Sequence, residues 1–386
     1  MLRKIHRWIG LALILPFALQ GLTGFLLVVL PLLLAGRPAV PAPGATTAPA
    51  GVGAEAMIAA ARTASPAGTL PLRFDPPRWP GDSAVVAFGP AGERHPEFEV
   101  MVDPTRAAIL RTRIVPHILR VLHDLHADLL LLPYGQQATG VMGVLLSVMA
   151  ITGLILWWPH PALWASGKWR RTITVSPRAR GYRLWREAHL SLGFWTLGMM
   201  LFLALSGTVL AFPFARPLFG VQGGDRPAHT RTHHAGHTPA APGEQGLDTA
   251  MAAVRAQMPD AILTSARLGA RPAEQSFTII LPVYGPNRPA TVRYDADADT
   301  VRFIRDPGRQ RTGELTFMWL HTLHEAKLAG PAVIAGLWRT AVGFAGAALF
   351  FFSLSGGVMW DMRRRAAART ARVTAVPDAS GTPDRL

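Results

Sequence analysis

The chain has 386 residues, of which 49% are hydrophobic, and a formal net charge of +15 at pH 7. It contains no cysteine, which excludes disulfides, thiolate metal sites, iron–sulfur clusters and covalently attached c-type haem. Much of the positive charge flanks apolar stretches, where it orients membrane spans and meets anionic lipid, so we expect membrane lipid and no nucleic acid as partners.

Four stretches stay apolar for about the 20 residues that a helix needs to cross the hydrocarbon core of a membrane. They are expected near residues 8–35, 138–158, 190–214 and 332–360. Basic residues precede the first stretch, fill the loop between the second and third, and follow the fourth, which predicts that both termini are cytoplasmic. We therefore expect a multi-pass protein of the bacterial inner membrane, with the long connections 37–136 and 215–331 in the periplasm.

Each long connection is expected to form a small module in which one helix precedes an antiparallel sheet. In the first module we predict a helix over 55–64 and strands over 83–88 and 98–102. The second has a predicted helix over 247–257 and strands near 277–281 and 290–294. Residues 37–52, rich in Pro, Ala and Gly, are predicted to be flexible, and the His-rich residues 221–246 to be disordered with at most a weak metal site.

The two halves of the chain repeat one pattern of histidine and glycine. His6-Arg-Trp-Ile-Gly10, running to Leu22-Thr23-Gly24, has the same spacing as His189-Leu-Ser-Leu-Gly193, running to Leu205-Ser206-Gly207. Likewise, Leu122-His-Asp-Leu-His126 and Thr152-Gly153 match Leu320-His-Thr-Leu-His324 and Ser355-Gly356. These matches indicate a duplication. The fold class expected is an α-helical membrane protein whose four transmembrane helices form a two-fold internal repeat, with two small α+β modules.

The duplication divides the chain into segments that follow one another in the same order in both halves. They are a first transmembrane helix at 1–36, a periplasmic module at 37–116, an HxxH segment with the second helix at 117–160, a cytoplasmic loop at 161–188, a third helix at 189–214, a His-rich linker with the second module at 215–314, an HxxH segment with the fourth helix at 315–362, and a cytoplasmic tail at 363–386.

Histidines at the edges of the apolar segments indicate b-type haem, because imidazole is an axial ligand of haem iron and polar groups beside a span are costly without a role. Two halves of the same topology are related by an axis along the membrane normal, so equivalent residues face each other across it. His6 and His189 then meet at the cytoplasmic edge, and the two HxxH pairs meet at the outer edge. One histidine from each half supplies the two ligands of each iron, which predicts two bis-His b haems.

Which histidine of each HxxH is the ligand stays open, because the i, i+3 spacing puts both imidazoles on one helical face. We favour His126 and His324, which lie nearer the spans, and the spare His123 and His321 then contact a propionate, a second haem or the substrate. Arg339 lies inside the fourth apolar stretch, where it either pairs with a haem propionate or extends toward the outer surface.

Several of these motifs together resemble the PepSY-associated transmembrane proteins, over nearly the whole chain. The motifs are His6-Arg7-Trp8, Val102-Asp103-Pro104, Ile151-Thr152-Gly153-Leu154, Trp157-Trp158-Pro159 and Leu323-His324-Glu325. The family includes inner-membrane ferric-siderophore reductases with two b haems, which this sequence looks like. The resemblance implies two periplasmic PepSY-like modules and an oxidoreductase that reduces Fe(III)-siderophore and releases Fe(II).

No G-x-G-x-x-G follows a predicted strand, and no cytoplasmic segment is large enough for a flavin or nicotinamide domain. The electron donor is therefore expected to be another molecule, either a cytoplasmic reductase or membrane quinol. Two alternatives remain open: a permease or accessory protein for siderophore or metal, and a PepSY-bearing regulator of a periplasmic enzyme.

Overall fold

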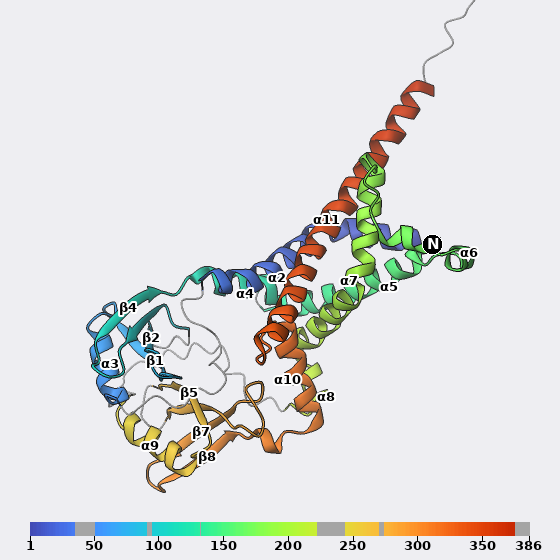
Figure 1. Cartoon of the computed structure of the whole chain (residues 1–386). Helices are drawn as coiled ribbons and strands as arrows, with labels where there is room; N and C mark the ends of the chain where they lie inside the picture. Colours follow the sequence, from blue (N-terminus) through green and yellow to red (C-terminus); the bar gives the residue numbers. More distant parts are fainter. Residues whose placement is uncertain (35–50, 91–94, 132, 222–243, 270–273, 375–386) are drawn as a thin grey trace, which may run out of the picture.

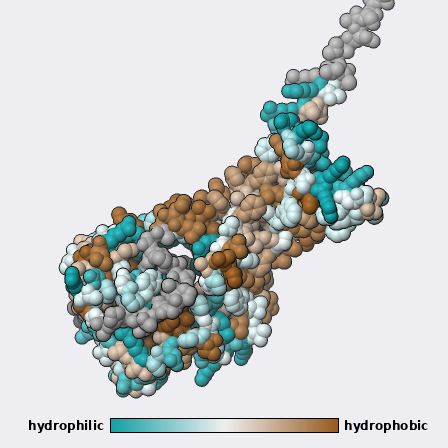
Figure 2. All heavy atoms as spheres, in the orientation of Figure 1, coloured by the Kyte–Doolittle hydropathy of each residue, from teal (hydrophilic) through white to brown (hydrophobic). Residues whose placement is uncertain are grey.

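The structure is a computed structural model that describes residues 1–34, 51–90, 95–131, 133–221, 244–269 and 274–374. The predicted disordered His-rich tract at 221–246 and the predicted flexible segment at 37–52 lie almost wholly outside these residues. Figure 1 shows two parts, a group of long helices and a β-sheet with its own small helices. Figure 2 shows apolar residues along the helical part and hydrophilic ones at its end away from the sheet.

Four helices are long and apolar enough to cross a membrane, as the sequence predicts. They are α2 (Ile14–Leu34), α5 (Gly135–Trp157), α7 (Gly181–Ala211) and α11 (Ala332–Thr374). Helix α2 packs on α11, and α5 packs on α7. Glycines allow the first of these contacts, because a Cβ on Gly21 would lie 2.6 Å from the backbone nitrogen of Phe350.

The helix boundaries differ from the predicted apolar stretches. The sequence predicts one segment over 8–35, whereas the chain forms a separate helix α1 (Leu2–Ala12) that ends at Leu13 before α2 begins. Helix α7 starts at Gly181, ahead of the predicted 190, and α11 continues past the predicted 360. The boundaries differ because hydropathy shows where the residues become polar and not where the helix ends. The polar run from Gly181 to His189, for example, is helical although it lies outside the apolar stretch.

Two further helices carry the HxxH motifs between the sheet and the membrane helices. Helix α4 (His117–Asp128) packs on α2 and α5, and α10 (Thr312–His324) packs on α7. The remaining short elements connect the long ones. They are α6 (Pro161–Ala165), η1 (Lys168–Ile173), α8 (Ala215–Leu218) and η3 (Pro307–Arg309).

The two long connections form a single antiparallel sheet of eight strands in the order β4-β3-β2-β1-β5-β6-β7-β8. The first connection supplies β1 (Thr69–Asp75), β2 (Ala84–Pro90), β3 (Phe98–Val102) and β4 (Ile109–Ile114). The second supplies β5 (Ile262–Arg267), β6 (Ser276–Ile280), β7 (Ala290–Asp295) and β8 (Thr300–Arg305). Strands β1 and β5 join the two halves, with Phe74 opposite Ala266.

Each half of the sheet has one helix, as predicted: α3 (Ala54–Arg62) and α9 (Leu247–Gln257). Both helices bury residues in one continuous core with the sheet, in which Phe74, Phe88 and Phe277 are fully buried. The helices also cap each other. The Asp248 carboxylate accepts from the backbone N–H of Ala54 at 2.5 Å, and the Glu55 carboxylate accepts from the N–H of Asp248 at 3.2 Å.

Candidate functional site

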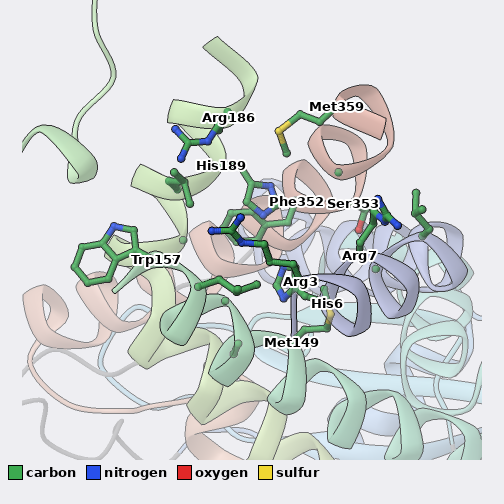
Figure 3. Close-up of a pocket in the computed structure, with 18 of the residues that line it drawn as sticks. Arg3, His6, Arg7, Met149, Trp157, Arg186, His189, Phe352, Ser353 and Met359 are labelled. Atoms are coloured by element: carbon green, nitrogen blue, oxygen red, sulfur yellow. The ribbon is translucent and has the colours of Figure 1, made fainter. Parts of the chain in front are cut away.

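A large cavity opens between helices α1, α5, α7 and α11 at the end of the helical part away from the sheet. Its volume is about 730 Å³, within the range that cofactor sites have. Apolar side chains such as Met149 and Phe352 line its inner walls, and Figure 3 shows them around His6 and His189. The two histidines that the sequence pairs at one membrane edge therefore line a single cavity.

The cavity is strongly basic at its mouth. No Asp or Glu lines it, and its cationic lining residues are Arg3, Lys4, Arg7, Arg186, Arg363 and Arg364. Within the part of the chain that the structure describes, none of the six forms an ion pair with a carboxylate. The indole N–H of Trp157, which also lines the cavity, is buried and has no hydrogen-bond partner there. An anionic ligand with an apolar body would satisfy both features.

Each of these two histidines is held by a hydroxyl from another membrane helix. The Nδ1 of His6 lies 2.9 Å from the Thr152 hydroxyl on α5. The Nδ1 of His189 lies 2.7 Å from the Ser355 hydroxyl on α11. In both imidazoles, Nε2 has no hydrogen-bond partner among the described residues.

A second pair of histidines lies at the other end of the membrane helices, near the sheet. The rings of His126 and His324 have centroids 6.4 Å apart and are tilted by 51°. Their Nδ1 atoms are held by the hydroxyls of Thr23 at 2.9 Å and Ser206 at 2.8 Å. Two metal–nitrogen bonds of about 2 Å and two ring radii of about 1 Å add up to roughly 6 Å, so this separation suits one metal ion between the rings.

Both histidines of this second pair are neutral near pH 7. Burial lowers the pKa of His126 to about 3 and that of His324 to about 4. Burial would raise the pKa of the neighbouring Glu325, but the hydrogen bond from His321 and the charge of Lys327 outweigh it and bring that pKa to about 2. Neutral imidazole is the form that binds a metal ion.

The other histidines of the HxxH motifs lie at the surface. His123 is exposed, with Nδ1 3.3 Å from the Asp124 carboxylate, and His321 is exposed, with Nε2 3.0 Å from the Glu325 carboxylate. The structure therefore separates the members of each motif into one imidazole that faces its counterpart and one near solvent. Arg339 is half-buried on α11 and forms no hydrogen bond or ion pair with any described residue.

Four site residues were missed by the sequence analysis as functional groups, namely the hydroxyl residues Thr23, Thr152, Ser206 and Ser355. All four are buried. Their signal was present, because each one precedes a glycine in the motifs that repeat between the halves. Among the described residues, no group of three or more His, Asp or Glu is arranged to hold a metal ion.

The fold and these sites define a membrane protein with four spanning helices, two histidine pairs at opposite ends of the helices, and a β-sheet outside them. The family model for the PepSY-associated TM region matches residues 3–364. The chain belongs to this family, which confirms the resemblance inferred from its motifs. Comparison with curated proteins finds no match.

Proposed function

We propose that the protein is a di-haem b oxidoreductase of the inner membrane that passes electrons across the membrane to periplasmic Fe(III)-siderophore and releases Fe(II). The observation that carries this proposal is the pairing of His6 with His189 and of His126 with His324. Each pair takes one imidazole from each half of the chain, and none of the four Nε2 atoms has a hydrogen-bond partner in the described part of the chain. Two imidazoles facing one iron are the ligand set of a bis-His b haem.

The cavity at His6 and His189 fits a haem. Its apolar walls suit a macrocycle, and its six cations with no lining carboxylate suit two propionates. We assign the propionates to this basic mouth, where Arg3, Arg7 and Arg186 lie beside the two histidines in Figure 3. Haem b, when bound, supplies a one-electron carrier that needs no covalent attachment, in keeping with a chain that lacks cysteine.

Two carriers are needed because the two histidine pairs are far apart. His189 of the first pair and Ser206, which holds His324 of the second, lie seventeen residues apart on the continuous helix α7. At 1.5 Å per residue this is about 26 Å along the helix axis, close to the thickness of the hydrocarbon core. A buried apolar cluster within the membrane helices includes Phe17, Met142 and Met200, of which Phe17 and Met200 also line the cavity of the first pair.

The orientation of the protein in the membrane is inferred from the positions of its basic segments. The mouth of the basic cavity is proposed to face the cytoplasm, because short basic segments stay on that side. A cytoplasmic reductase or membrane quinol is then the electron donor. The periplasmic side then holds the sheet, the pair His126 and His324, and the exposed His123 and His321, and the ferric substrate binds there.

The chain is proposed to be a duplication, and its two halves run through helices and strands in the same order.

The chemistry needs one electron for each iron. Fe(III) is a hard ion that siderophores hold through oxygen ligands, and its one-electron reduction to Fe(II) weakens that match and loosens the complex. A quinol donor would give two electrons and two protons and so reduce two ferric ions. A reductase donor would deliver the same electrons from a soluble cofactor.

Reoxidation of the protein by a ferric chelate tests the proposal. Protein purified in detergent is reduced with dithionite, freed of excess reductant and mixed with ferric siderophore, while its haem absorption is followed. We expect reoxidation of the haem together with formation of Fe(II), trapped by a ferrous-specific chelator. Haem that stays reduced would contradict the reductase and favour the permease or regulator.

The outer pair is tested by substitution at both members of each motif. The haem proposed between His126 and His324 is called the outer haem, and the one at His6 and His189 the inner haem. His126→Ala or His324→Ala should abolish the low-spin spectrum of the outer haem. His123→Ala and His321→Ala should retain it and slow reduction of the chelate. Loss of the haem in the second set but not in the first would reverse the choice of ligands.

A further inference from the structure

Each of the four paired histidines contacts a Thr or Ser of a membrane helix that is followed by glycine, and we call this pair of residues a socket. The first residue is a buried Thr or Ser whose hydroxyl lies within 2.9 Å of an imidazole Nδ1, and the second is glycine. The four sockets are Thr23-Gly24, Thr152-Gly153, Ser206-Gly207 and Ser355-Gly356. Each histidine lies on a different helix from the one that carries its socket.

Each socket hydroxyl also lies within hydrogen-bond distance of a backbone carbonyl on its own helix. A hydroxyl has one proton to donate. Thr152 donates it to the Val148 carbonyl at 2.8 Å, one helical turn back, and Thr23 donates to the Leu19 carbonyl at 2.8 Å. With its proton on the carbonyl, the hydroxyl accepts from the imidazole, and in that arrangement Nδ1 carries the hydrogen and Nε2 keeps its lone pair.

The socket hydroxyls in the second half of the chain make the same two kinds of contact. Ser206 donates to the Phe202 carbonyl at 2.8 Å, and Ser355 donates to the Phe352 carbonyl at 3.2 Å. In the same arrangement, His324 and His189 also donate from Nδ1. This arrangement gives all four imidazoles the tautomer that offers Nε2 to a metal.

Two of the four glycines, Gly24 and Gly207, leave room for an imidazole ring. A Cβ on Gly24 would lie 3.1 Å from Cε1 of His126, and one on Gly207 would lie 3.0 Å from Cε1 of His324. At Gly153 the distance to Cε1 of His6 would be 3.4 Å, an ordinary contact, and a Cβ on Gly356 would meet no atom within 4 Å. A Cβ at Gly24 or Gly207 would require the ring to shift by a few tenths of an ångström.

We propose that Thr23, Thr152, Ser206 and Ser355 are positioning residues that hold the axial histidines, and that the repeated hydroxyl–glycine pair is a histidine socket. This inference rests on the proposed di-haem function. Because a hydroxyl is a neutral and weak acceptor, it leaves the imidazole neutral, whereas a carboxylate in its place would draw on the Nδ1 proton and make Nε2 more basic. The hydroxyls thereby keep the haem potentials higher than carboxylate partners would.

The test uses three variants of one helix, α5, in the full chain. Thr152→Val removes the hydroxyl and keeps the shape, Thr152→Ser restores the hydroxyl, and Ser147→Ala is the control. Ser147 is buried on the same helix, but its hydroxyl donates to the Gly143 carbonyl and contacts no histidine. For each purified variant the haem content, the midpoint potentials and the electron paramagnetic resonance of the low-spin iron are measured.

We expect Thr152→Val to weaken the affinity for the haem at His6 by about 10- to 100-fold and to alter its resonance and potential, with the outer haem unchanged. Thr152→Ser should resemble the unsubstituted protein, and so should Ser147→Ala. If Thr152→Val is not recovered folded, Ser355→Ala takes its place, because Ser355 holds the other histidine of the same pair.

Two outcomes separate failure of this inference from failure of the proposed function. In the first, the unsubstituted protein binds two haems, and a folded variant without the hydroxyl has the same haem content, potential and resonance. That result would overturn the positioning role of the hydroxyls and leave the di-haem function standing. Unsubstituted protein that binds no haem would overturn both.

Discussion

Replacing Gly207 by alanine should weaken the binding of the outer haem. A glycine-to-alanine change at another position of the same helix should leave haem binding unchanged. The added Cβ would lie 3.0 Å from Cε1 of His324, while ordinary contacts begin at 3.4 Å, so the ring must move by about 0.4 Å. Displacement of a ligand from the group that hydrogen-bonds its other ring nitrogen typically costs 10- to 100-fold in affinity, or about 1.4 to 2.8 kcal/mol of haem-binding free energy. Helix propensity works in the opposite direction, because alanine is favoured over glycine by about 1 kcal/mol in a helix interior.

Gly198→Ala is the matched control, because Gly198 lies on the same helix α7 and its Cβ would meet nothing within 4 Å. The assay is the rate at which the outer haem is lost to excess apomyoglobin, together with haem content. Gly207→Ala should lose the outer haem at least tenfold faster than Gly198→Ala, with the inner haem unaffected in both. Equal rates in the two variants would refute the placement of His324 against Gly207.

Further predictions concern the other parts of the structure. His6→Ala or His189→Ala should remove the inner haem and leave the outer one, and loss of both haems at normal yield of folded protein would contradict two independent sites. Asp248→Ala removes the cap shared by the two sheet helices and should lower stability by about 1 kcal/mol, seen as a lower melting temperature in detergent. The haem-free protein should lose stability as the pH falls from 6.5 toward 4. In that range the unfolded chain gains protons at His126 and His324, whose folded pKa values are lowered to about 3 and 4, so equal melting temperatures at pH 7.5 and 5 would contradict their burial.

The membrane helices could be predicted because their signal is local. A span needs about 20 apolar residues in succession, and all four spans meet that condition. The break at Leu13 could not be found in this way, because both sides of it are helical and the apolar pattern continues across it. Pairing of His126 with His324 was predicted from the repeat, which gives symmetry-related residues without any knowledge of contacts.

The joining of the two predicted modules into one sheet has no local signal. Strands β1 and β5 pair across nearly two hundred residues, through Arg73 with Arg267 and Phe74 with Ala266. The sequence analysis did not predict β1 and β5 as strands, and it also missed the outer strands β4 and β8, whose residues are largely exposed and lack the alternation of a half-buried strand. Buried hydroxyls escaped notice for a related reason: Thr and Ser are common in membrane helices, and only the contact with a histidine gives these four a role.

Haem stoichiometry tests the central claim most directly. Full-length protein, expressed with haem precursor and purified in detergent, is assayed for haem b by pyridine haemochrome and for protein by amino-acid analysis. The account predicts two haems per chain with the low-spin spectrum of bis-His ligation, falling to one when either histidine pair is disrupted. One haem or none in a fully loaded preparation would contradict it.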